Sequence, residues 1–333
     1  MAAHHGPDGR FRNPPGSPRS QAGARDMLRF FADMWREGST VANPPGHALD
    51  PAAVLAATVG APNPSVTWLG HAAFLIRSAG KVVLTDPFLG ETAGPAILGR
   101  HFGPRRHVPP AIAAPDLPPI DILLLSHNHY DHLDVPTLKT LAANPATQVL
   151  VPLGLGRMMQ KLGFARVQEL DWWDERSFGG LDIRFLPAVH FSGRGPFDRK
   201  KTLWGSFGLY ADDARIWFSG DSATGEVFKE IGQKAGPFDL GLVGIGAYEP
   251  RHIMQASHAT PEEAVGMLRA IRARRGIGMH WGTIKLTTED PFEAPARFKA
   301  AARDQGYGED NALILKIGET LALAEKPVAA AAE

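Results

Sequence analysis

Short apolar runs separated by glycine, proline and acidic residues predict a chain of alternating strands and helices from Ser65 onward. The predicted strands cover residues 66–69, 73–76, 81–85, 121–126, 149–151, 167–170, 181–185, 206–210, 215–219, 240–245, 276–279 and 312–316. Amphipathic segments between them predict helices at 135–143, 156–162, 226–235, 261–274 and 295–305. Hairpins occur beside the strand–helix alternations, which favours two β-sheets sandwiched between helices over one doubly wound parallel sheet.

The residues before Ser65 have a different pattern. Residues 1–26 are rich in Pro, Gly, Ser and Arg, so they bury little apolar area and are expected to be disordered. Residues 27–64 are expected to form an amphipathic helix and a linker, ahead of a folded domain at 65–325 and a flexible tail at 326–333. The apolar positions of this helix are Met27, Leu28, Phe30, Phe31, Met34 and Trp35. They either dock on the domain or contact lipid, since arginines surround them.

Composition excludes several kinds of chemistry. The 333 residues contain no cysteine, which excludes disulfides, thiolate metal ligands and cysteine nucleophiles. Lys plus Arg and Asp plus Glu both number 35, so overall charge gives no indication of a nucleic-acid partner. A signal peptide and an apolar run of membrane-spanning length are not evident, which predicts a cytoplasmic protein that can still bind peripherally to a membrane.

A dense histidine cluster follows the apolar strand at 121–126. Within six residues the chain places four side chains that can bind metals, His127, His129, Asp131 and His132. His127 and His129 are two residues apart, so an extended backbone directs both to the same side. Such polar groups are costly at the end of a buried strand unless they are ligated. The cluster therefore predicts a metal site.

Further candidate ligands end other predicted strands, namely His190, Asp221 and His280. Imidazole and carboxylate ligands without sulfur are compatible with Zn, Mn or Fe, and we expect two divalent metal ions, with Zn favoured. His258 precedes the helix at 261–274 and is the candidate proton donor, because histidine titrates near neutrality. A structural hydrogen bond at the helix entry is the alternative role for His258.

A second set of residues is expected around the ligands. Asp86 and His71 end strands on the same side, and either they or Thr283 can hold a ligating histidine through its second ring nitrogen. Tyr248 and Arg251 lie on a loop after a buried strand. Arg251 can bind a phosphate in a bidentate manner, or it can form a structural salt bridge.

The order of the seven ligand candidates along the chain, and their positions after predicted strands, resemble those of the metallo-β-lactamase superfamily. Runs outside the ligands resemble its N-acyl-phosphatidylethanolamine-hydrolysing phospholipase D family, among them 151–155, 169–173, 236–240, 245–251, 261–265 and 280–283. The resemblance covers about 65–316 and implies an α/β fold, a four-layer αββα sandwich of two mixed sheets flanked by helices. It also implies one metal held by His127, His129 and His190, another held by Asp131, His132 and His280, and Asp221 as the bridge.

The same resemblance implies a reaction and a setting. The family cleaves N-acyl-phosphatidylethanolamine to N-acylethanolamine and phosphatidic acid at a membrane surface, often as a homodimer. Hydroxide generated by the two metals would attack phosphorus while Asp131 helps to orient the nucleophile. His258 would protonate the leaving oxygen, since the family places a histidine there in the active site. The alternatives are a lactonase or a soluble phosphodiesterase of the same fold, similar to sugar-phosphate lactonases, and a non-enzymatic metal-binding protein.

Overall fold

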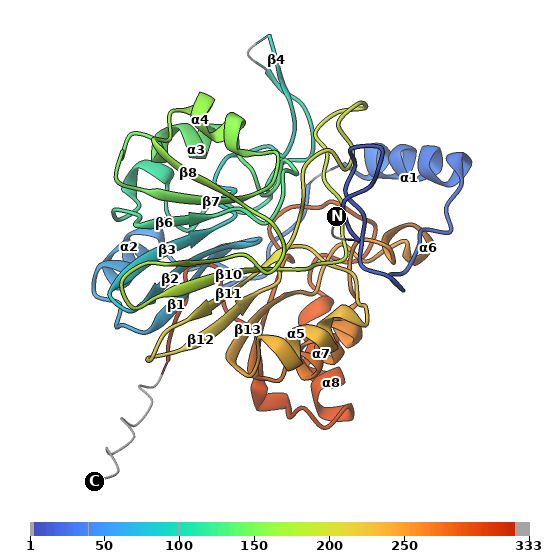
Figure 1. Cartoon of the computed structure of the whole chain (residues 1–333). Coiled ribbons are helices and arrows are strands. Elements are labelled where there is room, and N and C mark those ends of the chain that lie inside the picture. The colour runs from blue at the N-terminus through green and yellow to red at the C-terminus, as the bar shows by residue number, and fades with distance from the viewer. Residues whose placement is uncertain (1–2, 39, 99, 324–333) are drawn as a thin grey trace.

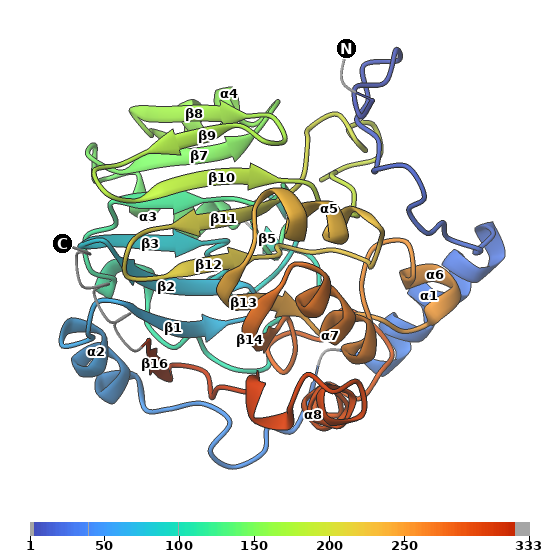
Figure 2. The same cartoon turned by 60° about the horizontal axis from the view of Figure 1, so that its bottom comes forward.

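Two seven-stranded sheets face each other, and helices cover their outer faces (Figures 1 and 2). The computed structural model describes residues 3–38, 40–98 and 100–323. In the first sheet the strand order is β16-β1-β2-β3-β6-β7-β8, and in the second it is β15-β14-β13-β12-β11-β10-β9. This confirms the α/β, four-layer αββα sandwich with two mixed sheets flanked by helices.

The first sheet comprises β1 (Ser65–Gly70), β2 (Ala73–Ser78), β3 (Lys81–Thr85), β6 (Ile122–Leu124), β7 (Gln148–Pro152), β8 (Arg166–Leu170) and β16 (Thr320–Ala322). The second comprises β9 (Glu175–Ser177), β10 (Asp182–Leu186), β11 (Ser206–Tyr210), β12 (Arg215–Phe218), β13 (Phe238–Gly244), β14 (Ala273–Met279) and β15 (Ala312–Leu313). A separate hairpin pairs β4 (Ala96–Ile97) with β5 (Arg100–His101).

Both sheets are built in the same way. An antiparallel set, β1–β2–β3 or β9–β10–β11–β12, continues into a parallel set, β6–β7–β8 or β13–β14–β15. Parallel neighbours need a crossover connection, and in this fold helices supply most of them. The carboxyl ends of parallel strands meet at one edge, so residues that follow these strands are brought together.

The helices are α1 (Ala24–Glu37), α2 (Pro51–Val59), α3 (Val135–Leu141), α4 (Gly156–Leu162), α5 (Val227–Lys234), α6 (Arg251–Met254), α7 (Pro261–Ala270) and α8 (Ala294–Asp304), with short 3₁₀ turns at Ala114–Asp116 and Glu309–Asn311. α4 contacts β7 and β8, while α7 contacts β13 and β14. Covered sheets bury their strands on both faces, and all six residues of β1 are buried. Apolar side chains from both sheets, such as Trp68 and Phe207, belong to one continuous core. No helix among the described residues is long and apolar enough to cross a membrane.

Residues 3–23, here called the N-terminal arm, lie in irregular conformation against the domain, which differs from the disorder expected for 1–26. The arm is held on the domain by polar contacts, and not by the burial of a large apolar area. Asp171 accepts hydrogen bonds from His4 Nε2 (2.6 Å) and His5 Nε2 (2.7 Å). Farther along, Phe11 N donates to Lys200 O (2.8 Å).

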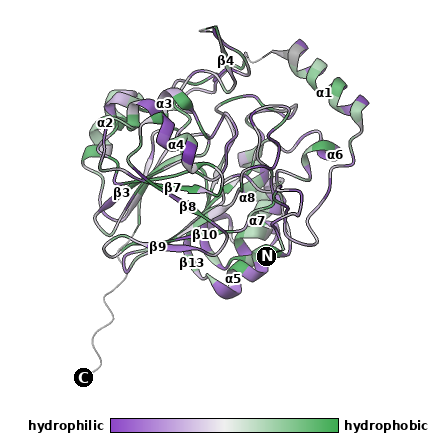
Figure 3. Cartoon of the chain, turned by 45° about the horizontal axis from the view of Figure 1, so that its top comes forward, coloured by the Kyte–Doolittle hydropathy of each residue, from purple (hydrophilic) through white to green (hydrophobic). Residues whose placement is uncertain are grey.

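The amphipathic helix α1 begins at Ala24, earlier than the expected Met27, because the Asp26 side chain accepts a hydrogen bond from Gly23 N (2.7 Å). Its apolar face is only partly packed. Phe30 is buried, whereas Leu28 is 71% exposed and Phe31 is 61% exposed. Figure 3 shows α1 apart from the two sheets, with both hydrophobic and hydrophilic residues along it. The predicted tail at 326–333 lies outside the described residues.

Candidate metal centre

The predicted site residues follow strand ends at one edge of the sandwich. His71 follows β1, Asp86 follows β3 and His280 follows β14. All three have a left-handed backbone, with φ of 55°, 30° and 64°. This conformation is costly for residues with a Cβ, and it persists where the surrounding structure fixes it, commonly at functional sites.

Four side chains form a first group around one carboxylate oxygen. His127 Nε2 lies 3.8 Å and His190 Nε2 lies 3.7 Å from Asp221 Oδ2. His129 Nδ1 lies 2.9 Å from His127 Nε2 and 3.2 Å from His190 Nε2. All four ligand atoms are within 4.8 Å of one another. Three imidazole nitrogens and one carboxylate oxygen make a donor set that suits a tetrahedral metal ion.

A second group shares the same carboxylate. Asp131 Oδ2 lies 3.5 Å from both His132 Nε2 and His280 Nε2. Asp221 reaches this group too, with Oδ2 3.1 Å from His132 Nε2 and Oδ1 3.2 Å from His280 Nε2. His71 completes the group through a 2.9 Å hydrogen bond from its Nε2 to Asp131 Oδ2. Asp221 thus lies between two sets of ligands.

The chemistry of the two groups fits divalent cations. His132 Nε2, His280 Nε2 and Asp221 Oδ1 are buried without a hydrogen-bond partner, although such atoms are costly to leave unpaired. Burial alone would lower the pKa of His132, but Asp221 and Asp131 outweigh it and raise that pKa well above its ordinary value. They also raise the pKa of His280 to about 9 against the effect of burial. The buried carboxylates therefore attract positive charge, and bound metal ions can replace these protons.

His258 lies next to both groups. Its ring centroid is 5.1 Å from that of His190 and 5.3 Å from that of His280. Burial lowers the pKa of His258 to about 4, partly offset by the negative charge of Asp221. The imidazole is therefore neutral near pH 7, able to accept a proton on one ring nitrogen and donate from the other.

The comparisons with known proteins agree with this geometry. A family model described as a beta-lactamase superfamily domain matches residues 81–281. The chain belongs to the metallo-β-lactamase superfamily. Over 240 residues it is 39% identical to N-acyl-phosphatidylethanolamine-hydrolyzing phospholipase D 1 of Caenorhabditis elegans, covering 69% of this chain and 67% of that protein. It is 30% identical over 261 residues to the mitochondrial N-acyl-phosphatidylethanolamine-hydrolyzing phospholipase D of Saccharomyces cerevisiae, covering 76% of this chain and 55% of that protein.

Among solved structures, a metallo hydrolase of Ignicoccus hospitalis is similar in fold, with a TM-score of 0.58 at 19% identity, covering 77% of this chain and 97% of that chain. The resemblance inferred from the motifs is thus confirmed, and this superfamily member is a metal-dependent hydrolase. It spans about two thirds of the worm relative's length and about half of the yeast relative's.

Buried partners orient the imidazoles of the hydrolase. Asp86 accepts hydrogen bonds from Ser126 N (2.7 Å), from Ser126 Oγ and from His132 Nδ1 (2.7 Å). His132 therefore directs its Nε2 toward Asp221. Ser126 Oγ in turn lies 2.8 Å from His127 Nδ1, which leaves His127 Nε2 for the first group. Fixing one ring nitrogen sets the tautomer and direction of the other.

Two predicted residues support the site from outside. Thr283 Oγ1 accepts a hydrogen bond from His71 N (2.9 Å) and so holds the strained strand end. Arg251 Nη2 lies 2.6 Å from Glu263 Oε2, and its Nη1 donates to His258 O (2.7 Å). Of the two roles expected for Arg251, the structure shows the salt bridge, which fixes the loop that carries His258.

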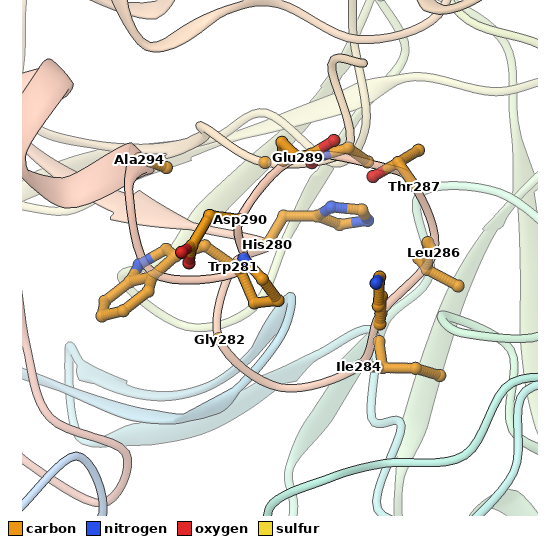
Figure 4. A pocket seen from close by; sticks show the side chains of 13 residues that line it. His280, Trp281, Gly282, Ile284, Leu286, Thr287, Glu289, Asp290 and Ala294 are labelled. Carbon is orange, nitrogen blue, oxygen red and sulfur yellow. The ribbon is translucent and has the colours of Figure 1, made fainter. Parts of the chain in front are cut away.

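Tyr248 is not brought to the metal ligands. Its hydroxyl donates to Glu293, and its ring packs under the guanidinium of Arg297, 4.7 Å from ring centroid to Cζ. A narrow pocket beside His280 is lined by residues of the turn 282–294 (Figure 4). In that view the side chains of His280 and Trp281 point to opposite sides. His280 reaches Asp221, whereas the Trp281 ring packs against Trp68 and His47.

Two residues, Asn13 and Arg194, support the site although nothing in their local sequence predicts it. Asn13 Oδ1 accepts hydrogen bonds from His190 N (3.0 Å) and Trp204 Nε1 (2.9 Å), across separations of 177 and 191 residues. Arg194 Nη1 donates to Leu133 O (2.8 Å), and its guanidinium lies 3.7 Å from the Tyr130 ring centroid, which locks the histidine-rich loop.

Proposed function

We propose that the hydrolase is a dinuclear phosphodiesterase that cleaves phospholipids of the N-acyl-phosphatidylethanolamine type to N-acylethanolamine and phosphatidic acid. The observation that carries the proposal is the position of Asp221 between the two groups. Its Oδ2 faces His127 and His190 of the first group and His132 of the second, and its Oδ1 faces His280. The substrate class is supported by the 39% and 30% identity to two phospholipases D of this specificity.

In this proposal His127, His129 and His190 hold one ion, and Asp131, His132 and His280 hold the other, with Asp221 shared. Zn is the favoured metal, and Mn and Fe are alternatives for the same nitrogen and oxygen ligands. When bound, two such ions lower the pKa of a water molecule and polarise a phosphoryl oxygen.

The chain's own residues supply positioning and proton transfer. Asp131, held by His71, orients the attacking water toward phosphorus. His258 lies beside both ligand groups, and its neutral ring accepts a proton from the water and passes one to the leaving oxygen. Arg251 keeps His258 in place through its backbone carbonyl.

Peripheral contact with a phospholipid surface is part of the proposal. Leu28 and Phe31 of α1 are largely exposed, and Leu98 in the β4–β5 turn is 99% exposed. A cavity of about 400 Å³ is lined by Phe31 on the side of α1 and by Pro104 on the side of the β4–β5 segment. Exposed apolar groups gathered on neighbouring segments favour an interaction surface.

The test presents metal-loaded protein with liposomes that contain N-acyl-phosphatidylethanolamine and measures N-acylethanolamine and phosphatidic acid. Wild type should release both, and Asp221→Asn should release neither, because the amide keeps the shape but lacks the shared charge. Asp304→Asn, a carboxylate-to-amide change on an exposed residue of α8, is the matched control. If the wild type releases neither product, the lipid assignment is wrong, and soluble phosphodiesters and lactones become the next substrates.

A further inference from the structure

A polar cavity of about 450 Å³ opens beside the metal centre. One wall is the arm from Arg12 to Ser20, and the opposite wall contains His190 and the pair Arg199 and Lys200. In Figures 1 and 2 the dark blue arm runs beside the yellow-green loop 191–202. The cavity is thus shared by a candidate metal ligand and two segments that lie far apart in the sequence.

Backbone contacts fix the basic side of the cavity. Lys200 N donates to Ser192 O (2.8 Å), and Lys200 O accepts from Phe11 N (2.8 Å). Lys200 itself has a left-handed backbone with φ of 61°, which is costly for this residue type. Arg10 donates to Arg199 O. The arm and the loop therefore hold this basic pair in one place.

Arg199 lies one aromatic ring away from the first ligand group. Its Cζ is 4.0 Å from the Phe191 ring centroid. The Phe191 ring is in turn 4.5 Å from His129 and 5.0 Å from His190, measured between ring centroids. A group bound by Arg199 would thus lie next to a molecule held at the metals, and not at the metals themselves.

Arg199 and Lys200 are not paired with a carboxylate among the described residues, and Arg12 has one distant contact, 3.9 Å to Asp8. The nearby Asp198 accepts hydrogen bonds from the backbone of its own loop. Burial lowers the pKa of Lys200, the charges of Arg199 and Arg12 lower it further, and the charge of Asp8 opposes them to a smaller extent. Basic residues that line one cavity without a carboxylate partner for Arg199 or Lys200 are suited to an anion such as a phosphate.

We propose that the arm and the loop 191–202 form an anion subsite that binds a second phosphate group, close to the phosphodiester cleaved at the metals, and that Arg199 and Lys200 determine this specificity. The inference rests on the proposed phosphodiesterase function for its substrate class. Binding itself is tested without turnover. The second phosphate belongs either to the same substrate molecule or to a neighbouring lipid.

The experiment measures binding to the metal-loaded protein by calorimetry. The ligands are propyl phosphate and a series of linear alkanediol bisphosphates with increasing linker length. Wild type should bind at least one bisphosphate about tenfold more tightly than propyl phosphate, because a second charge-assisted contact forms. The double variant Arg199→Gln/Lys200→Gln should lose this preference and still bind propyl phosphate as wild type does. Lys229→Gln/Lys234→Gln on α5 removes the same net charge far from the cavity and should keep the preference.

A wild type without preference for any bisphosphate, or a preference that survives in the Arg199/Lys200 variant, would overturn the subsite. If that variant fails to fold, Arg12→Gln on the exposed arm replaces it and should lower the preference about threefold. Liposomes with and without added phosphatidic acid distinguish the two sources of phosphate. If binding to liposomes depends on Arg199 and Lys200 only when phosphatidic acid is present, the second phosphate belongs to a neighbouring lipid. Loss of phospholipid cleavage with an intact bisphosphate preference would reject only the proposed function.

Discussion

Replacement of Asp86 by asparagine should weaken the binding of one of the two proposed metal ions, the one at His132, more than that of the other. Asp86 is fully buried and accepts three hydrogen bonds, two from Ser126 and one from His132 Nδ1. Asparagine has nearly the same shape and tolerates the left-handed backbone at this position, where φ is 30°. It keeps one acceptor oxygen, so if that oxygen stays with Ser126 N, its amide nitrogen faces His132 Nδ1. His132 must then accept there, and its hydrogen moves to Nε2, the atom that faces Asp221.

The magnitude at His132 follows from the contact to Nδ1 that is reversed. A hydrogen bond to a charged group contributes about 1.5–3 kcal/mol, which corresponds to a roughly 10- to 100-fold change in affinity. Competition with a chromophoric chelator should show this loss for the ion at His132. The loss for the ion at His127 should be smaller, because Ser126 Oγ loses its acceptor on Asp86 but can still accept from His127 Nδ1. Asp121→Asn, at the opposite end of β6, is the control and should bind both ions as wild type does. Equally tight binding of both ions by Asp86→Asn would refute the tautomer argument.

Two further predictions concern the N-terminal segments. Burial alone would raise the pKa of Asp171, but hydrogen bonds from His4, Trp172 N and His5 outweigh burial and lower that pKa. The contact of Asp171 with the arm therefore stabilises the protein above the ordinary carboxyl pKa of about 4, and this stabilisation is lost as the pH falls below that value. Hydrogen exchange should therefore show the arm amides losing protection before those of β13 as the pH is lowered from 6 to 3, and simultaneous loss would contradict this. Leu28→Ser/Phe31→Ser should lower sedimentation with phospholipid vesicles without lowering the melting temperature, since both side chains are exposed; unchanged sedimentation would exclude this face as the membrane contact.

The layered fold was predictable because its strands and helices are local patterns that glycine and proline interrupt. The convergence of His127, Asp221 and His280 was predictable for a related reason, since residues that follow strand ends meet at one sheet edge. Tyr248 shows the limit of this reasoning. Its loop lies near the site, but its hydroxyl donates a hydrogen bond to Glu293 and does not reach the metal ligands. The sequence pattern does not predict the direction in which a loop side chain points.

The N-terminal arm was expected to be disordered because composition measures how much apolar area a segment can bury. It does not register a few specific polar contacts with distant residues. The hydrogen bond from His190 N to Asn13 Oδ1 is one such contact. Nothing in the sequence around residue 13 indicates that His190 is its partner. The role of Arg251 was left between two alternatives for the same reason, since a guanidinium suits a phosphate and Glu263 equally well.

The contact between Asn13 and His190 also limits when the arm can dock during synthesis of the chain. Contacts that close large loops form late, because the chain entropy lost on closure is recovered only when the enclosed structure is already in place. On a ribosome, Asn13 emerges long before His190 and Trp204 exist as partners, so the arm cannot dock until the chain has been synthesised through Trp204. The strands from β1 to β10 are therefore available for pairing before the arm can reach its place beside His190.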